Sequence, residues 1–259
     1  MNKVLTIAGS DCSGGAGIQA DIKTITAHRM YAMSAITALT AQNTTSVYGV
    51  QETPADFLAQ QLDCIFTDIV PDAVKIGMVS SAENISVISD RLRHYGAQNI
   101  VLDTVMFSTS GRALLKPEAM DALRTQLLPL AQLITPNIPE TEALCGSRIE
   151  TREQMEQAGF AIAAQTGGAV LVKGGHLAGA ADDLLVWNGQ AFWFEGTRID
   201  NPNTHGTGCT LSSAIACALA AGACMPDAVR QAKAYLTGAL RDGLNLGAGN
   251  GPLNHCWNL

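Results

Sequence analysis

Short apolar stretches alternate with longer stretches whose apolar positions recur at helical spacing. The apolar stretches are rich in Val, Ile and Leu, which is typical of strands that are buried on both faces. We predict strands at 4–9, 34–40, 73–79, 99–105, 132–137 and 169–175. We predict helices at 17–29, 54–68, 81–96, 117–128, 138–145, 151–166, 207–222 and 226–244. This alternation predicts an α/β protein in which helices cover both faces of a mostly parallel sheet.

Two other stretches predict antiparallel strands. Residues 46–51 indicate an edge strand, and residues 183–196 indicate a hairpin. Its turn would be Asn188-Gly189, a dipeptide that favours two-residue hairpin loops. We expect this hairpin at an edge of the sheet. Because the chain contains no repeat, low-complexity tract or linker, we predict one domain over residues 1–259.

The composition excludes some partners and locations. The 259 residues are 47% hydrophobic and carry a formal charge of −7, with Lys and Arg scattered, so we expect neither nucleic acid nor a membrane as a partner. The seven cysteines include no C-x-x-C pair, which disfavours a disulfide framework and favours a reducing, cytoplasmic location. Residues 201–226 lack charged side chains but contain polar residues and prolines, so we interpret them as a loop and a buried helix. The first apolar run is too short for a signal peptide.

The N-terminal loop GSDCSGGAG (9–17) joins a predicted strand to a helix. Residues 15–20 fit the dinucleotide pattern G-x-G-x-x-A, but these glycines begin well past the strand end. No Asp or Glu occurs between Asp21 and Glu52, so the acid that would bind a ribose is missing. Two interpretations remain, a flexible turn that starts a helix or a loop that wraps a small substrate. Four glycines beside Asp11 and Asp21 favour the second.

Two later strand ends carry charged side chains. In TPNIPE (135–140), Asn137 and Glu140 have the spacing of a capping box, and Glu140 could equally face a Mg²⁺ ion at the carboxyl end of a strand. In VKGGH (172–176), Lys173 is either a surface cation or a group that contacts a transferred phosphate. Neither motif decides between its two interpretations by itself.

The most specific local pattern is NTHGTGCT (203–210), which opens a predicted helix. Gly206 and Gly208 would let an anion approach the backbone, and the helix would present free N–H groups and its positive dipole end. The alternative is a glycine-rich helix start followed by a buried free thiol at Cys209. No two histidines have the H-x-H or H-x-x-x-H spacing of a metal site, so His205 and the others are expected in loops, solvated or hydrogen-bonded.

Eight motifs follow one another nearly from end to end: LTIAGSDCSGGAGIQADIKT (5–24), ITALTAQNT (36–44), KIGM (75–78), VLDTVM (101–106), LITPNIPE (133–140), LVKGGH (171–176), NTHGTGCT (203–210) and GNGPLNH (249–255). In this order they resemble the hydroxymethylpyrimidine/phosphomethylpyrimidine kinases of thiamine biosynthesis, within the ribokinase-like superfamily. The resemblance implies a three-layer α/β/α fold. It also implies a kinase that uses ATP and Mg²⁺ to phosphorylate 4-amino-5-hydroxymethyl-2-methylpyrimidine and then its monophosphate.

The resemblance implies roles for individual residues. The pyrimidine edge would be bound by Gln42, whose amide can donate and accept at once. The same pocket would be lined by Gly9, Asp21, Met78 and Asp103. ATP and Mg²⁺ would be contacted by Asn137, Glu140, Lys173, Thr204, Gly206 and Lys233, with Glu140 beside the metal. The catalytic set would be Lys173, Gly206, Gly208 and Cys209.

Cys209 distinguishes this branch from the sugar kinases of the superfamily, in which the loop ends in aspartate, the proposed base. A helix N-terminus lowers the pKa of a cysteine, so we expect the pKa of Cys209 near the optimum for a general base. A thiol offers a second gain, because it can stay neutral when the acceptor of the second transfer is already an anion.

The nearest alternative function is pyridoxal kinase, because some members of this branch phosphorylate both ring types. A cysteine hydrolase that uses Cys209 and His205 is disfavoured, since no separate oxyanion donor is available. A catalytically silent binding protein is disfavoured, since every expected catalytic position is occupied. The resemblance suggests a homodimer, with residues 31–51 as part of the interface, and residues 105–112 have the composition of a mobile lid.

Overall fold

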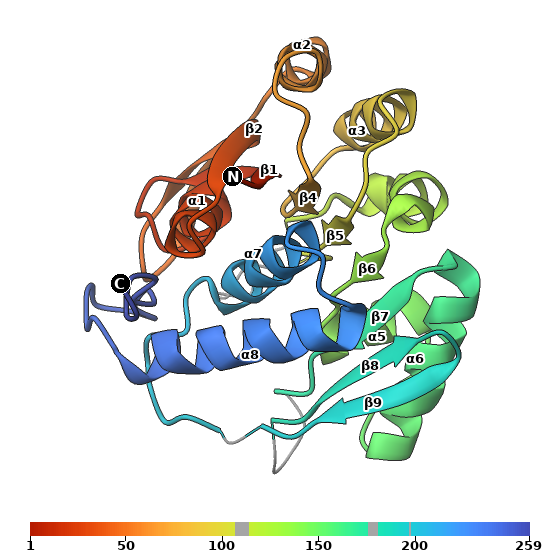
Figure 1. Ribbon diagram of the computed structural model, residues 1–259, viewed down its shortest axis with the longest axis vertical. Coiled ribbons are helices and arrows are strands. Elements are labelled where there is room, and N and C mark those ends of the chain that lie inside the picture. Colours follow the sequence, from red (N-terminus) through yellow and green to blue (C-terminus); the bar gives the residue numbers. More distant parts are fainter. Residues whose placement is uncertain (107–113, 176–180, 197) are drawn as a thin grey trace.

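The computed structural model describes residues 1–106, 114–175, 181–196 and 198–259. Within them, the strands form one sheet in the order β3-β2-β1-β4-β5-β6-β7-β8-β9 (Figure 1). The strands are β1 Lys3–Asp11, β2 Tyr31–Gln42, β3 Val47–Glu52, β4 Ala73–Ile76, β5 Ile100–Leu102, β6 Leu133–Ile134, β7 Ala169–Val172, β8 Asp183–Trp187 and β9 Gln190–Phe194. The segment 105–112, whose composition suggested a mobile lid, lies largely outside the described part of the chain.

The centre of the sheet is parallel and both of its edges are antiparallel. Strands β2, β1, β4, β5, β6 and β7 run in one direction. At one edge β3 pairs antiparallel with β2, and at the other β8 and β9 form a hairpin beside β7. Asn188 and Gly189 both have positive φ, 50° and 70°, as a type I′ turn requires. The predicted edge strand and hairpin are confirmed.

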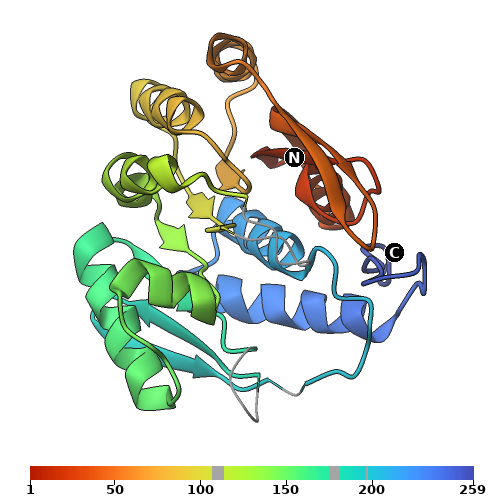
Figure 2. The ribbon, with the colours of Figure 1, turned by 180° about the vertical axis from the view of Figure 1, so that it is seen from behind.

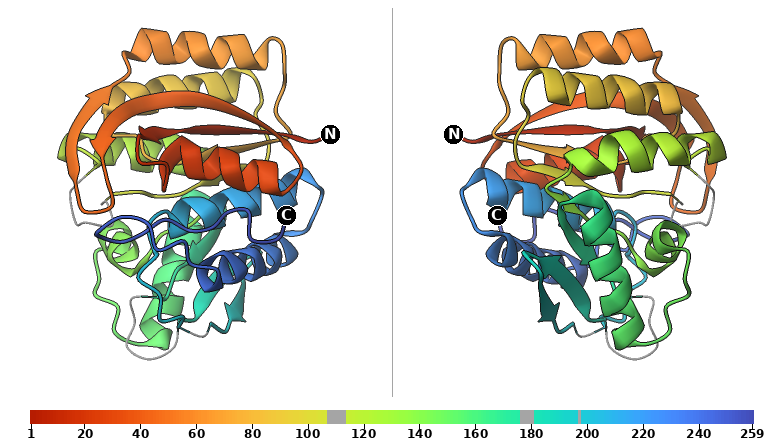
Figure 3. Two further views of the ribbon diagram at one scale, coloured as in Figure 1. Left: turned by 90° about the vertical axis from the view of Figure 1, so that its left-hand side faces the viewer. Right: turned by 90° about the vertical axis from the view of Figure 1, so that its right-hand side faces the viewer.

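Helices lie on both faces of this sheet (Figures 1 and 2). They are α1 Gly17–Ala27, α2 Ala55–Phe66, α3 Ala82–His94, α4 Met120–Ala122, α5 Ile138–Cys145, α6 Arg152–Thr166, α7 Thr207–Ala220 and α8 Met225–Arg241. Seen edge-on in Figure 3, α2 and α3 lie on one side of β1, and α1, α7 and α8 lie on the other. None of the helices that the structure describes is long and apolar enough to cross a bilayer.

Each face of the sheet has its own apolar core. Successive side chains of a strand point to opposite faces, so Val170 packs with α6 while Leu171 packs with α7 and α8. In the same way, Leu5 belongs to the core that contains Val170, and Val4 belongs to the core that contains Leu171. Because both faces are covered, the strands need apolar residues at consecutive positions, and this is why they gave such a clear pattern in the sequence.

Several predicted elements differ from the structure, among them the strands expected at 73–79, 99–105 and 132–137, which end at Ile76, Leu102 and Ile134. The expected helix at 117–128 is a series of short turns, with 3₁₀ segments at Pro117–Ala119 and Leu128–Leu130, α4 between them, and a π segment at Leu123–Leu127. Proline lacks an N–H and cannot continue a regular helix, and Pro129 lies in the last 3₁₀ turn, where the series ends at Leu130. The strand expected at 169–175 ends at Val172.

Candidate active site

A cavity of about 1610 Å³ opens at the carboxyl ends of the parallel strands. In α/β sheets ligands bind at this edge, because the loops after the strands converge there. The predicted site residues that line the cavity are Gly9, Gln42, Met78, Asp103, Asn137, Glu140, Lys173, Thr204, Gly206, Gly208, Cys209 and Lys233. The structure therefore brings together residues that are far apart in the sequence.

The N-terminus of α7 points into this cavity without a cap. Gly206 is the N-cap and has φ 88°, and a Cβ there would overlap the carbonyl oxygen of Gly15. The N–H of Thr207 donates to Thr204 O, whereas those of Gly208 and Cys209 have no acceptor in the described part of the chain. Two free N–H groups at the positive end of a helix form an anion site.

The half-buried Lys173 forms an ion pair with the buried Asp103 beside this helix end. Lys173 Nζ lies 2.9 Å from Asp103 Oδ1, which also accepts from the hydroxyl of Thr135 at 2.9 Å. Burial raises the pKa of the Asp103 carboxyl, but the positive charges of Lys173 and Lys75 outweigh it and hold that pKa below its ordinary value. A Cβ on Gly208 would lie 3.1 Å from Asp103 Oδ2, so the pair lies directly against the helix end.

Glu140 completes the capping box that the spacing predicts. Its N–H donates to Asn137 Oδ1 at 2.9 Å, and its Oε2 accepts from Asn137 N at 2.9 Å and from the hydroxyl of Thr104 at 3.0 Å. Oε1 accepts from the N–H of Met106 at 3.3 Å. Burial raises the pKa of Glu140, and the charge of Lys173 opposes that shift. The capping interpretation is confirmed, and the same carboxylate lines the cavity.

The pKa expected for Cys209 is wrong in direction. Burial raises the pKa of this thiol to about 11, and the charge of Lys75 and the N–H of Gly17 only partly oppose it. The helix N-terminus does not overcome the loss of water around a thiolate, and the carboxylates of Asp21 and Asp103 disfavour the thiolate further. Cys209 is a neutral thiol at neutral pH.

Asp21 does not line the cavity, contrary to our expectation. It is fully buried and pairs with Lys75, whose Nζ lies 2.9 and 2.8 Å from its two oxygens. It also accepts from the hydroxyls of Thr6 at 2.6 Å and Ser213 at 2.8 Å. Asp21 therefore joins α1, β1, β4 and α7 beneath the site. The sequence did offer a signal, because Lys75 is the one charged residue in the apolar run AVKIGMV and needs a buried acid.

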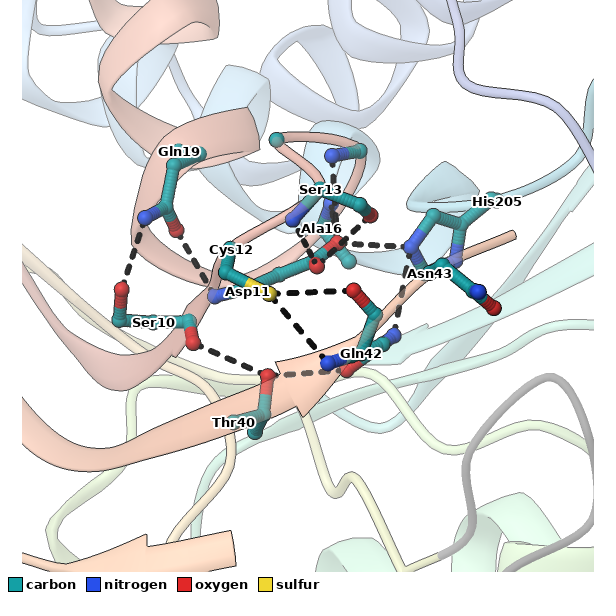
Figure 4. Close-up of polar contacts among 12 residues, drawn as sticks. Ser10, Asp11, Cys12, Ser13, Ala16, Gln19, Thr40, Gln42, Asn43 and His205 are labelled. Carbon is teal, nitrogen blue, oxygen red and sulfur yellow. Dashed lines mark hydrogen bonds and ion pairs between the residues drawn. The ribbon is translucent and has the colours of Figure 1, made fainter. Parts of the chain in front are cut away.

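The N-terminal loop at residues 9–17 is built around Asp11 (Figure 4). Its carboxylate accepts from the N–H and hydroxyl of Ser13, at 2.9 and 2.8 Å, and from the N–H groups of Gly15 and Ala16, at 3.2 and 2.9 Å. His205 Nε2 lies 2.8 Å from Asp11 Oδ2. Burial raises the pKa of Asp11, but these hydrogen bonds outweigh it and lower that pKa to about 2. The loop of nine residues is thus folded around one ionised side chain.

Gln42 lies at the end of β2, between this loop and the cavity (Figure 4). One end of its amide lies 3.1 Å from Thr40 Oγ1, and the other lies 3.4 Å from His205 Nε2. Its backbone C=O accepts from Cys12 Sγ at 3.1 Å. The sequence placed Gln42 correctly at a strand end. It did not predict the contact between Gln42 and His205, because no local pattern links two residues that are 163 positions apart.

Lys233 lies at another part of the cavity wall. It forms an ion pair with Asp183, and Asp183 accepts from the N–H of Gly174 at 2.9 Å. Helix α8 is thereby tied to the hairpin edge of the sheet. Among the described residues, no group of three His, Cys, Asp or Glu side chains could hold a metal ion by itself.

The geometry matches a known family of kinases. The family model "Phosphomethylpyrimidine kinase" matches residues 11–254. The chain belongs to the phosphomethylpyrimidine kinase family. A hydroxymethylpyrimidine/phosphomethylpyrimidine kinase of Streptomyces coelicolor is 46% identical over 256 residues, which cover 99% of this chain and 95% of that protein. The family predicted from the motifs is confirmed, and this kinase is a phosphotransferase.

Solved structures agree with this assignment. A phosphomethylpyrimidine kinase of Clostridium difficile is 46% identical and superposes with a TM-score of 0.83, covering 92% of this chain and 98% of its own. A pyridoxal kinase of Bacillus subtilis, solved as an ADP complex, is 38% identical with a TM-score of 0.91, covering 98% and 97%. The ribokinase-like fold is confirmed. Both structural relatives are kinases of small molecules, and the second was solved with a bound adenine nucleotide.

Proposed function

We propose that this kinase transfers the γ-phosphate of ATP to the hydroxymethyl group of 4-amino-5-hydroxymethyl-2-methylpyrimidine, and then a second γ-phosphate to the monophosphate product. The observation that carries the proposal is the uncapped N-terminus of α7, whose free N–H groups at Gly208 and Cys209 face one cavity together with Gln42 and Lys173. This arrangement offers an anion hole between a ring-binding amide and a phosphate-binding cation.

The pyrimidine would lie against Gln42, Gly9 and Met78. The Gln42 amide can accept from the ring's amino group while it donates to a ring nitrogen. Gly9 leaves little spare room, because a Cβ there would lie 3.1 Å from Met78 Cε. The hydroxymethyl group would then face Cys209, which lines the same cavity.

ATP would occupy the part of the cavity lined by Asn137, Thr204 and Lys233. Its transferring phosphate would meet the N–H groups of Gly208 and Cys209, and Lys173 would neutralise part of its charge. The Lys173 ammonium is half-buried and already oriented by Asp103, so little reorganisation is needed during transfer.

The residues present fit a magnesium ion that keeps several waters. The Glu140 carboxylate already accepts three hydrogen bonds from protein donors. Its remaining acceptor position could accept from a water that is bound to the ion. Asp103 offers a second carboxylate, whose Oδ2 has no hydrogen-bond donor among the described residues. The ion would take its remaining ligands from phosphate oxygens, and when bound it would neutralise phosphate charge.

Cys209 would serve the two transfers differently. The first acceptor is an alcohol and must lose a proton. We propose that the thiolate, a minor form of Cys209 at neutral pH, accepts this proton, with the Lys75 ammonium stabilising that form. The second acceptor is already an anion. A neutral thiol does not repel it, as a carboxylate in the same place would.

Competition kinetics test the proposed substrate. We expect kcat/KM to be higher for the hydroxymethylpyrimidine than for pyridoxal when both compete in one reaction. Pyridoxal kinase is the second candidate, and the close superposition on the Bacillus subtilis enzyme favours it. A higher kcat/KM for pyridoxal would overturn the pyrimidine proposal in favour of that candidate.

The exchange Gln42→Leu tests how the ring is recognised. It leaves a ring donor and acceptor unpaired, so we expect a cost of about 1–3 kcal/mol, seen as a higher KM for the pyrimidine with an unchanged KM for ATP. Gln98→Leu, at an exposed residue outside the cavity, is the control. An unaltered KM for the pyrimidine in Gln42→Leu would refute this role.

We also propose that the chain is one domain and acts as a cytoplasmic homodimer. All described strands belong to one sheet, and all seven cysteines are free thiols, as in a reducing compartment. At the β3 edge, Leu39, Tyr48 and Val50 are 54%, 66% and 37% exposed. These apolar side chains lie within the predicted interface at 31–51, and a second subunit would cover them.

A further inference from the structure

The Gln42 amide is held at both ends by protein groups. Its Oε1 lies 3.1 Å from Thr40 Oγ1, and its Nε2 lies 3.4 Å from His205 Nε2. The nitrogen and oxygen of an amide differ little in shape, so the partners decide which way round the amide lies. Both partners have further bonds that fix whether they donate or accept.

On the His205 side, the partner is a donor. Nε2 lies 2.8 Å from Asp11 Oδ2, and a carboxylate can only accept. Nε2 therefore carries the proton, and an amide N–H facing it would bring two donors together. The carbonyl oxygen of Gln42 is the group that fits here, as a second acceptor of the same N–H.

On the Thr40 side, the partner is an acceptor. The single hydroxyl proton of Thr40 is directed to the backbone oxygen of Ser10, at 3.0 Å. The oxygen is then free to accept, and the NH₂ group of Gln42 is the partner that fits. The two sides agree on one orientation, with the carbonyl on His205 and the NH₂ on Thr40.

We propose that His205, held by Asp11, is a positioning residue that locks the Gln42 amide in this orientation and so makes the site select 4-aminopyrimidines over 4-oxopyrimidines. This inference rests on the proposed function, in which Gln42 contacts the ring. A 4-aminopyrimidine presents a donor, its amino group, beside an acceptor, N3. It binds with the amino group toward His205 and N3 toward Thr40.

A 4-oxopyrimidine presents the opposite pattern, an acceptor at O4 beside a donor at N3–H. A locked amide meets it with oxygen against oxygen and N–H against N–H. An amide that is free to turn accepts both rings. A fixed amide orientation therefore predicts that the site discriminates between two ligands of nearly identical shape. A purely structural role for His205 predicts no such discrimination.

The loop can survive the loss of His205. Asp11 also accepts four hydrogen bonds from Ser13, Gly15 and Ala16, so its carboxylate stays paired when the imidazole is removed. Asp11 itself is a poor site for a test, because its exchange would release the whole loop. The informative variants are His205→Leu, which removes the donor, and His205→Gln, whose side-chain NH₂ restores one at a similar reach.

The experiment is calorimetric binding, without ATP, of 4-amino-5-hydroxymethyl-2-methylpyrimidine and of its 4-oxo counterpart. We expect the unchanged protein to prefer the amino compound by about tenfold or more, His205→Leu to lose most of that preference, and His205→Gln to keep it. Thermal melting of each variant checks that it is folded.

Several results would overturn the inference. They are an unchanged preference in His205→Leu, an equal loss of affinity for both compounds, or a His205→Gln variant that behaves like His205→Leu. Because the measurement needs no turnover, it is separate from the proposed function. Failure of the kinase assay with a retained binding preference would refute the function alone, and kinase activity without the preference would refute the lock alone.

Discussion

Buried charged side chains hold the active-site residues in place. Asp11 gathers the N-terminal loop and His205, and Asp21 gathers β1, β4 and α7 through Thr6, Lys75 and Ser213. In each case one carboxylate is bonded by several segments that are distant in the sequence. Such groups are costly to bury alone, so each fixes the relative position of everything that pairs with it.

The Lys75–Asp21 pair gives a stability prediction. Lys75→Met leaves the Asp21 carboxylate buried without its counter-ion, so we expect a loss of about 3–5 kcal/mol in the free energy of unfolding. In the double variant Lys75→Met with Asp21→Asn, the amide oxygen can accept from one of the Thr6 and Ser213 hydroxyls and the NH₂ group can donate to the other, so most of that loss should return. Urea denaturation of both variants checks this. A double variant that is no more stable than the single one would contradict it.

Local spacing explains which residues could be predicted at this scale. Asn137 and Glu140 are three positions apart, and the capping box is a local pattern. Lys75 and Asp21, and Asp11 and His205, are 54 and 194 positions apart. No local pattern joins them. The pKa of Cys209 is raised mainly by burial, which segments distant in the sequence produce around it, and this is why its shift was predicted with the wrong sign.

At the scale of elements, the two ends of α7 show what a glycine is needed for. Gly206 and Gly222 have nearly the same φ, 88° and 87°. A Cβ on Gly206 would overlap the backbone of Gly15, whereas nothing lies within 4 Å of one on Gly222. Only Gly206 brings the helix against the N-terminal loop at residues 9–17.

The two glycines therefore form a matched pair of variants. Gly222→Ala should cost about 1 kcal/mol in the free energy of unfolding, from the left-handed backbone alone, and leave kcat unchanged. Gly206→Ala should cost more stability and reduce kcat strongly, because the helix end must move away from Gly15. Denaturation curves and steady-state rates measure both effects. Equal effects of the two exchanges would show that close approach at Gly206 is unimportant.

The capping box on α5 offers another prediction. Glu140→Gln keeps the size of the side chain and an oxygen that can accept from Asn137, so stability should change by less than about 1 kcal/mol. Activity should fall and the Mg²⁺ concentration for half-maximal rate should rise. Glu142→Gln, on the same helix outside the cavity, is the control. If Glu140→Gln keeps both activity and Mg²⁺ dependence, capping is the only role of this residue.

At the scale of the whole molecule, the fold follows from a pattern that is continuous along the chain. Both faces of the sheet are covered, so the central strands are apolar at most positions on both faces, and the helices between them show one apolar side. The boundaries were harder to predict where tertiary contacts decide them. The strand expected at 169–175 ends at Val172, and the N–H of Gly174 donates to the side-chain carboxylate of Asp183 rather than to a backbone carbonyl of β8.

The central claim is that one site, the N-terminus of α7 with Cys209, performs two transfers of which only the first needs a base. The direct test is the single-turnover rate of each transfer in the unchanged protein, Cys209→Ala and Cys209→Asp. We predict that alanine slows transfer to the alcohol by about 10²–10⁴-fold and transfer to the monophosphate by less. Aspartate should retain more of the first transfer than alanine and impair the second more, since its charge repels an anionic acceptor. Equal losses in both transfers, with aspartate no better than alanine, would contradict the account.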